Sequence, residues 1–240
     1  MQRGSDQTQR NSQELFLSLV EQLSRPMLQI NQLAELAENA TATELEEQWQ
    51  VVRAITNASL QLVENYALSL RLHGKLTKLE LEPLAISSLL YDTAHVLTPF
   101  AKQYGVRLEL DLSSRLQPIL ADRSVLQSAM TSLGQVFILA SAEGDEVGAV
   151  SLAAHRSRYG VVAGMYGKHQ QLSTDSLRRA HAMQGKARQP LQRLVSGPAT
   201  GVFVAESLLQ TLSAHLHVAR FHNLTGLAAT LPASSQLQLV

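Results

Sequence analysis

The sequence predicts an α+β protein built from an antiparallel helical hairpin over residues 13–76 and an α/β sandwich over residues 77–240. Apolar residues recur every three or four positions from residue 16 to residue 70, which is typical of helices that bury one stripe. Beyond residue 85, stretches with this helical period alternate with short stretches of strand periodicity, which indicates helices on one face of a mixed sheet. Residues 1–12 are polar and are expected to form a disordered tail.

Composition argues against several classes of function. The 240 residues are 45% hydrophobic and carry no net charge, so the overall charge favours neither nucleic acid nor a membrane surface. The absence of cysteine excludes disulfides, thiolate metal sites and cysteine nucleophiles. No apolar run approaches the roughly 18 residues of a membrane helix, and the polar N-terminus does not resemble a signal peptide. We therefore expect a cytoplasmic protein that does not enter a membrane.

Two amphipathic helices form the predicted hairpin. The first contains Pro26, which removes one backbone hydrogen bond and is expected to kink the helix. Thr43 and Glu46 have the spacing of a capping box, which predicts that the second helix starts near Glu44, and Gly74 is expected to end it. The apolar stripes are Phe16, Leu19, Leu23, Met27, Ile30, Leu33 and Ala37 in the first helix, and Leu45, Trp49, Val52, Ile55, Leu62, Tyr66 and Leu70 in the second.

A single hairpin of this kind cannot bury both of its apolar stripes. Two copies can bury them by forming a four-helix bundle, so the sequence predicts a homodimer. The alternative is that the hairpin packs against the sandwich domain of its own chain.

The sandwich is predicted element by element from the change of period. Helices are expected over residues 85–105, 124–141 and 201–216, the first ending at Gly105. Residues 106–112 alternate strictly between apolar and polar, which predicts a half-buried strand. Further strands are expected over 118–122, 148–156, 159–167, 217–223 and 224–233.

This order of elements resembles the ATP-binding domain shared by histidine kinases, gyrase and the chaperone of the same ATPase superfamily. The likeness is strongest over residues 81–130, where a helix, a strand opening with Gly-hydrophobic, a Pro-bearing strand, Asp122 and Leu126 follow one another as in the kinases. The stretch SLVEQLSRPMLQI, residues 18–30, resembles the dimerisation helix of a bacterial sensor histidine kinase. The resemblance covers nearly the whole chain from about residue 12.

The groups that carry chemistry in that family are missing at the aligned positions. The phosphoacceptor histidine is replaced by Glu21, which cannot form a phosphoramidate. The family's two asparagines correspond to Ser132 and Val136, and the second of them holds Mg²⁺; valine offers no oxygen to a hard cation. The aspartate that receives the adenine amino group corresponds to Ala163.

The glycines that surround the nucleotide in the family are only partly kept. The aspartate box aligns with residues 163–167, in which Met165 replaces the first glycine and Gly167 keeps the last. The box before the final helix keeps Gly201 but has Ala199 in place of its other glycine, for which Gly197 offers partial compensation. A single glycine before a helix is also explained by a tight turn. The resemblance therefore implies a pseudokinase that binds neither ATP nor a metal, uses no cofactor and has no catalytic residue.

Two surfaces remain that can bind partners. In the family, response regulators dock on the first helix just beyond the phosphoacceptor; the matching positions here are Arg25, Leu28, Gln29, Gln32 and Glu35. We therefore expect a dimeric adaptor that binds a response regulator or a sensor kinase of a two-component pathway. The alternative from another class is an enzyme, either a histidine phosphotransferase or a residual ATPase.

The second surface is basic. Residues 168–200 hold six basic residues against one acidic residue, and they align with the mobile segment that covers ATP in the family. Arg178, Arg179, Lys186 and Arg188 form a possible surface for an anionic partner; a solvated loop is the simpler explanation. A transcription-linked regulator that contacts nucleic acid here is a further alternative, but Tyr166 is the only aromatic residue nearby.

Overall fold

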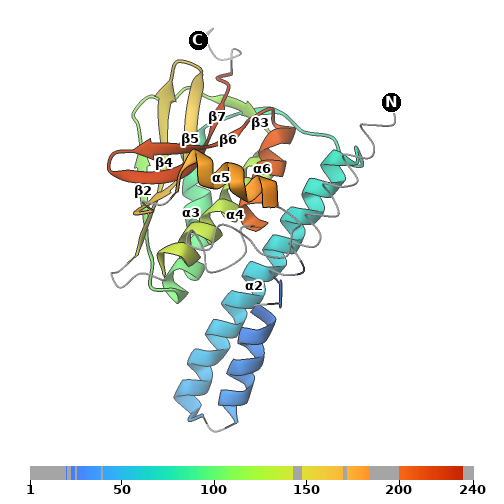
Figure 1. Ribbon diagram of the computed structural model, residues 1–240, viewed down its shortest axis with the longest axis vertical. Helices are drawn as coiled ribbons and strands as arrows, with labels where there is room; N and C mark the ends of the chain where they lie inside the picture. Colours follow the sequence, from blue (N-terminus) through green and yellow to red (C-terminus); the bar gives the residue numbers. More distant parts are fainter. Residues whose placement is uncertain are drawn as a thin grey trace.

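The structure, a computed structural model, describes residues 20, 23–24, 26–38, 40–142, 148–169, 172–183 and 200–234. It confirms the α+β class: two N-terminal helices form a long hairpin, and a mixed sheet with helices on one face follows (Figure 1). The predicted tail over residues 1–12, Glu21 and Arg25 lie outside the described residues, so neither the tail nor a kink around Pro26 is tested. The expected domain boundaries also remain predictions.

The hairpin consists of a first helix, continuous over residues 26–37, and α2, Ala42–His73. The capping box predicted at Thr43 and Glu46 was wrong by two residues. Thr41 caps α2 instead: its backbone N–H donates to Glu44 Oε2 at 2.8 Å, and its Oγ1 accepts from the Glu44 backbone N–H at 3.4 Å. Both pairs have the same spacing, and the earlier pair gives the longer helix. Gly74 ends α2 as predicted, through its N–H bond to Leu70 O at 2.8 Å.

The sandwich confirms every predicted helix and strand to within a few residues. The described helices are α3 (Ile86–Gln103), α4 (Arg123–Ser141), α5 (Thr174–Met183) and α6 (Thr200–Thr211). The described strands are β1 (Glu82–Leu84), β2 (Arg107–Leu112), β3 (Ile119–Ala121), β4 (Ala149–Ser157), β5 (Gly160–Gly167), β6 (Leu216–Phe221) and β7 (Leu224–Leu231).

The main sheet has five strands in the order β2-β4-β5-β7-β6, with β2 and β4 parallel and the other pairs antiparallel. Strands β1 and β3 form a separate antiparallel pair. Helices α3, α4 and α6 cover one face of the main sheet (Figure 1). Leu62, Tyr66 and Leu72 of α2 belong to the same buried core as these helices. The alternative arrangement, a hairpin packed on its own sandwich, therefore holds for the C-terminal half of α2.

The second face of the sheet is partly covered by side chains of the β6–β7 hairpin. The two strands were predicted, but this packing was not. The Phe221 ring stacks on His155 of β4 with 5.2 Å between ring centroids and lies 5.4 Å from the Tyr166 ring of β5. At the hairpin turn, His222 Nε2 lies 3.4 Å from Asp111 Oδ2 of the edge strand β2. A small second core forms around Ala153, Val162, Tyr166 and Ala228.

Asp122 ties the segment that follows α2 to the sandwich. Its Oδ1 caps α4 by accepting from the backbone N–H groups of Ser124 at 3.0 Å and Val125 at 3.2 Å, while its Oδ2 accepts from the Glu80 N–H at 2.9 Å. Burial alone would raise the pKa of the Asp122 carboxyl, but these hydrogen bonds together outweigh burial and lower the pKa. One side chain therefore caps a helix and fixes the linker to β1.

We expect Asp122→Ala to lower the free energy of unfolding by about 1–3 kcal/mol, because it removes a helix cap and leaves the Glu80 N–H without its acceptor. Asp122→Asn keeps a side-chain oxygen at the cap and should therefore lower the free energy of unfolding by less than Asp122→Ala. Since the folded-state pKa is lowered, the carboxylate's contribution is present above the ordinary aspartate pKa and is lost as pH falls through the lowered value. Urea unfolding followed by circular dichroism measures both variants; equal losses would argue against this role of the oxygen atoms.

Candidate functional site

The positions aligned with the family's nucleotide boxes come together where α4 meets the start of α6. Val136 is 2% exposed and faces Gly201 of α6. A Cβ atom added to Gly201 would lie 2.6 Å from Val136 Cγ2 and 3.1 Å from Ser132 O. The glycine thus permits a close approach of the two helices and lies inside α6, not in a turn before it. Ala199 and Gly197 lie outside the described residues.

Strand β5 brings the remaining aligned positions under the same helix. Ala163 and Met165 are fully buried and point into the main core, where β5 packs against α4. Ala163 lies between Ala154 and Ala229 of the neighbouring strands. The adenine-binding position of the family therefore has apolar neighbours and no side-chain hydrogen-bond acceptor of its own.

His169 fills the space beyond Gly167. A Cβ atom added to Gly167 would lie 2.8 Å from His169 Nε2. The His169 ring packs edge-on against Phe137 of α4, with ring centroids 5.2 Å apart, and its Nε2 lies 3.5 Å from Ser141 Oγ. Burial lowers the pKa of His169, which favours the neutral imidazole. A histidine from the segment after β5 thus acts here as a packing residue.

Ser132, the other aligned α4 position, is bound to the hairpin. Its Oγ accepts a hydrogen bond from Asn65 Nδ2 of α2 at 2.8 Å, and the same amide nitrogen lies 3.2 Å from Ser128 O. One turn further along α2, Ser69 Oγ lies 2.6 Å from Ser207 Oγ of α6. Helix α2 is therefore hydrogen-bonded both to α4 and to α6, the two helices that carry the aligned positions.

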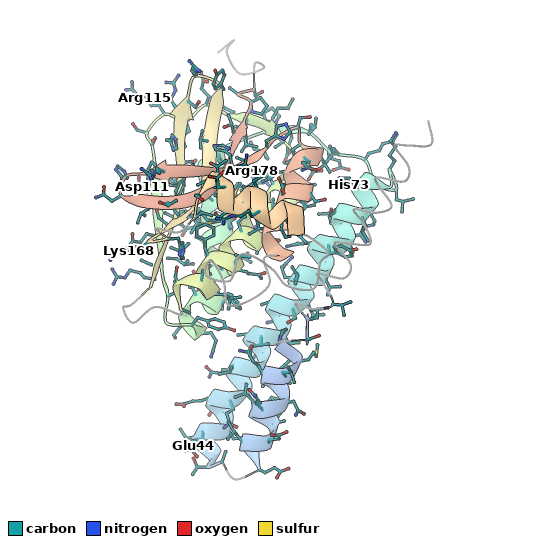
Figure 2. The ribbon with its side chains drawn as sticks, in the orientation of Figure 1. Glu44, His73, Asp111, Arg115, Lys168 and Arg178 are labelled. Carbon is teal, nitrogen blue, oxygen red and sulfur yellow. The ribbon has the colours of Figure 1, made fainter. Side chains whose placement is uncertain are left out.

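The predicted docking residues on the first helix are partly accessible. Leu28 is 62% exposed, and Gln32 and Glu35 are also exposed, whereas Gln29 is half-buried. Glu35 accepts a hydrogen bond from Asn31 Nδ2 at 2.9 Å. Figure 2 places Glu44 at the tip of the hairpin and His73 at the opposite end of α2. The first helix therefore presents a largely polar surface on which Leu28 and Leu36 are exposed.

Only part of the predicted basic surface is described. Arg178 and Arg179 are exposed on α5, where Arg178 pairs with Asp175 and Arg179 Nε donates to Asp175 O at 3.3 Å (Figure 2). Ser173 caps the helix by accepting from the Ser176 N–H at 3.1 Å. Lys186 and Arg188 lie outside the described residues. The two arginines are thus held to the start of their own helix by one acidic residue.

Glu206 is an unusual residue that the pattern of the sequence did not single out. It lies on α6 beside Ser207, and burial raises the pKa of its carboxyl to about 7. An acidic residue inside the apolar run VFVAESLL is the signal that could have identified it. The residue therefore changes its charge within the physiological pH range.

Comparison with known proteins finds likeness in structure but not in sequence. Neither a protein-family model nor a curated protein matches the chain. The Acinetobacter baumannii histidine kinase AdeS aligns with a TM-score of 0.55 at 12% identity, over 89% of this chain and 98% of AdeS. The histidine kinase ThkA, solved with the response regulator TrrA, aligns with a TM-score of 0.56 at 10% identity, over 90% of this chain and 60% of the kinase. A bacterial phosphotransferase aligns with a TM-score of 0.53 at 12% identity, over 92% of this chain and 95% of the phosphotransferase.

These alignments show that the chain has the fold of a histidine kinase, with a helical hairpin followed by the ATP-binding type of sandwich. The resemblance read from the sequence is confirmed at this level. Within the described part of the chain, no helix combines the length and the apolar composition needed to cross a bilayer. The residues at the positions predicted from the sequence to align with the family's ligand groups are Ser132, Val136, Ala163 and Met165.

The raised pKa of Glu206 predicts that stability depends on pH. The folded state holds the carboxyl proton more tightly than the unfolded chain does, so stability is full below the ordinary carboxyl pKa and falls as pH rises towards about 7. The free energy of unfolding of Glu206→Gln should therefore match that of the parent protein near pH 4.5. Above pH 7 it should be higher than that of the parent by on the order of 2 kcal/mol. Thermal unfolding across this range measures the difference; a pH-independent effect of the substitution would contradict the assignment.

Proposed function

We propose that the protein is a dimeric, non-catalytic relative of the histidine kinases that binds a response regulator or a sensor kinase. The observation that carries this proposal is the direct packing of α6 on α4 through Gly201, Val136 and Ser132. In the family those positions surround nucleotide and metal. Here they contact one another, and the side chains that remain supply neither a metal ligand nor an acceptor for adenine.

The cost of opening this packing supports the absence of nucleotide binding. Val136, Ala163 and Met165 are at most 2% exposed, so placing charged phosphates beside them would require separating two buried helices. Burial of a charge without a paired partner is far more unfavourable than the loss of an apolar contact. Valine and methionine also supply no hard oxygen ligand for Mg²⁺.

Exposed apolar side chains on the hairpin support a dimer. Trp49, Leu60 and Val63 of α2 are 60%, 55% and 37% exposed. At 100° per residue they fall within about 60° of one another around the helix, on a different side from the buried Ile55 and Leu62. Met27 adds a 57% exposed side chain on the first helix. A second copy that covers this stripe would complete a four-helix bundle.

The partner surface is the outer side of the first helix, defined by Leu28, Gln32 and Glu35 among the described residues. An exposed leucine among polar groups is the arrangement expected of a contact patch. ThkA, whose fold this chain shares, was solved in complex with the response regulator TrrA. We therefore assign a receiver-type regulator as the leading partner, and a sensor kinase as the second.

The proposal predicts no binding of a fluorescent ATP analogue with Mg²⁺ in a titration to about 1 mM, which corresponds to a binding free energy weaker than about −4 kcal/mol. The kinase ShkA, solved with AMPPNP, provides the positive control. Saturable micromolar binding would refute the non-catalytic assignment. Acid-labile phosphate on the chain after incubation with a phosphorylated regulator would instead support the phosphotransferase alternative.

Leu28→Arg should weaken binding to a captured response regulator at least tenfold, or about 1.4 kcal/mol, because it places a charge in the centre of the patch. Leu36→Arg is the matched control: Leu36 is 63% exposed on the same helix but points about 80° away from Leu28. Isothermal titration calorimetry measures both affinities, and sedimentation velocity verifies that both variants remain dimers. Equal affinities for both variants and the parent would exclude this surface.

A further inference from the structure

The hairpin and the sandwich are joined by a set of buried polar contacts. Asn65 is 1% exposed; its amide nitrogen contacts Ser132 Oγ and Ser128 O, and its Oδ1 accepts from Gln61 Nε2 at 3.0 Å. Ser69 is also 1% exposed and bonds to Ser207 across the α2–α6 interface. Both polar groups of the Asn65 side chain are thus hydrogen-bonded within the protein.

These contacts specify one position of α2 on the sandwich. Apolar packing by Leu62, Tyr66 and Leu72 would tolerate small shifts, because dispersion and burial have little directionality. A slide of one residue would move Asn65 by about 1.5 Å along the helix and turn it by about 100°. The amide and the buried hydroxyls would then be left without hydrogen-bond partners, which is unfavourable for buried polar groups. The polar contacts therefore determine the register of the interface.

The linker after α2 is fixed as well. Gly74 and Lys75 bond back to the last turn of the helix, and the Glu80 N–H is held by Asp122 of the sandwich. Leu79 packs against the main core just before this point. Only a few residues therefore separate the end of the docked helix from the next anchored residue, which leaves little chain to serve as a hinge.

We propose that the Asn65–Ser132 and Ser69–Ser207 contacts form an interdomain lock that holds the hairpin and the sandwich as one rigid body. The chain then acts without hinge motion between its two parts, and a partner bound to the first helix meets the sandwich in a fixed orientation. This inference goes beyond the proposed function, since it holds whether or not a regulator or a nucleotide binds. Ser132, which the sequence aligns with a nucleotide-facing position of the family, here accepts a hydrogen bond from the hairpin.

The absence of cysteine from the chain allows a direct test by disulfide trapping. The pair Ser69→Cys and Ser207→Cys places two thiols where the hydroxyl oxygens lie 2.6 Å apart, so a rigid interface should form the cross-link nearly completely under mild oxidation. The control pair is Ser59→Cys with Ser207→Cys. Ser59 is buried on the same helix, where its Oγ donates to Ile55 O at 2.8 Å, and it lies about 15 Å along α2 from Ser69. We expect at least a tenfold lower yield from the control pair.

Distance measurement between spin labels supplies a readout that does not depend on cross-linking. Labels at Glu46→Cys on the hairpin and Arg156→Cys on β4 occupy exposed positions. Dilution with unlabelled chain restricts the signal to distances within one copy. A single narrow distribution is expected, and it should broaden when Asn65→Ala and Ser69→Ala are combined. A broad distribution in the labelled parent, or equal cross-linking of the control pair, would overturn the lock.

Discussion

The packing around α4 is the constraint on which the rest of the structure depends. Gly134, in the middle of this helix, has no side chain because a Cβ atom there would collide with Leu97 of α3. On another side Val136 packs against Gly201 of α6, and Ser132 receives the Asn65 amide of α2. A glycine inside a helix costs roughly 1 kcal/mol relative to alanine, so its presence is explained by the close approach that it permits. Three other helices thus use α4 as their common support.

This packing is also the basis of the proposed function. In a domain that binds nucleotide, polar groups of α4 must face an open space; here Ser132 faces the hairpin and Val136 faces α6. Each of these two side chains makes its contacts within the protein. The valine and methionine side chains are buried in apolar contacts, and the serine side chain takes part in a protein hydrogen bond. Internal contacts of this kind stabilise the sandwich by themselves, which is what the proposed scaffold role requires.

Much of this fold could be predicted from local patterns, and the exceptions have a physical origin. Period alone identified α3 and the β4–β5 hairpin, because each buries one face or both faces in a regular way. The pairing of Asn65 with Ser132, 67 residues away, leaves no mark in periodicity, since an asparagine on an amphipathic helix usually faces solvent. The same holds for Phe221 on the second face of the sheet, whose cover depends on how the β6–β7 hairpin bends across β5 and β4. Thr41 was missed for a different reason: Thr43 offers the same capping motif, and only the chain's path into the helix distinguishes them.

Small hydroxyl side chains form the polar contacts between the hairpin and the sandwich. The small hydroxyl of Ser132 accepts from the neighbouring helix α2, which a longer amide side chain at this position would hold further away. Ser69 and Ser207 are likewise small polar residues where α2 and α6 approach each other closely, and their hydroxyl oxygens lie 2.6 Å apart. Small hydroxyl residues let two helices pack tightly and still satisfy their hydrogen bonds. The Asn65–Ser132 and Ser69–Ser207 contacts therefore join the hairpin to the sandwich through small polar side chains.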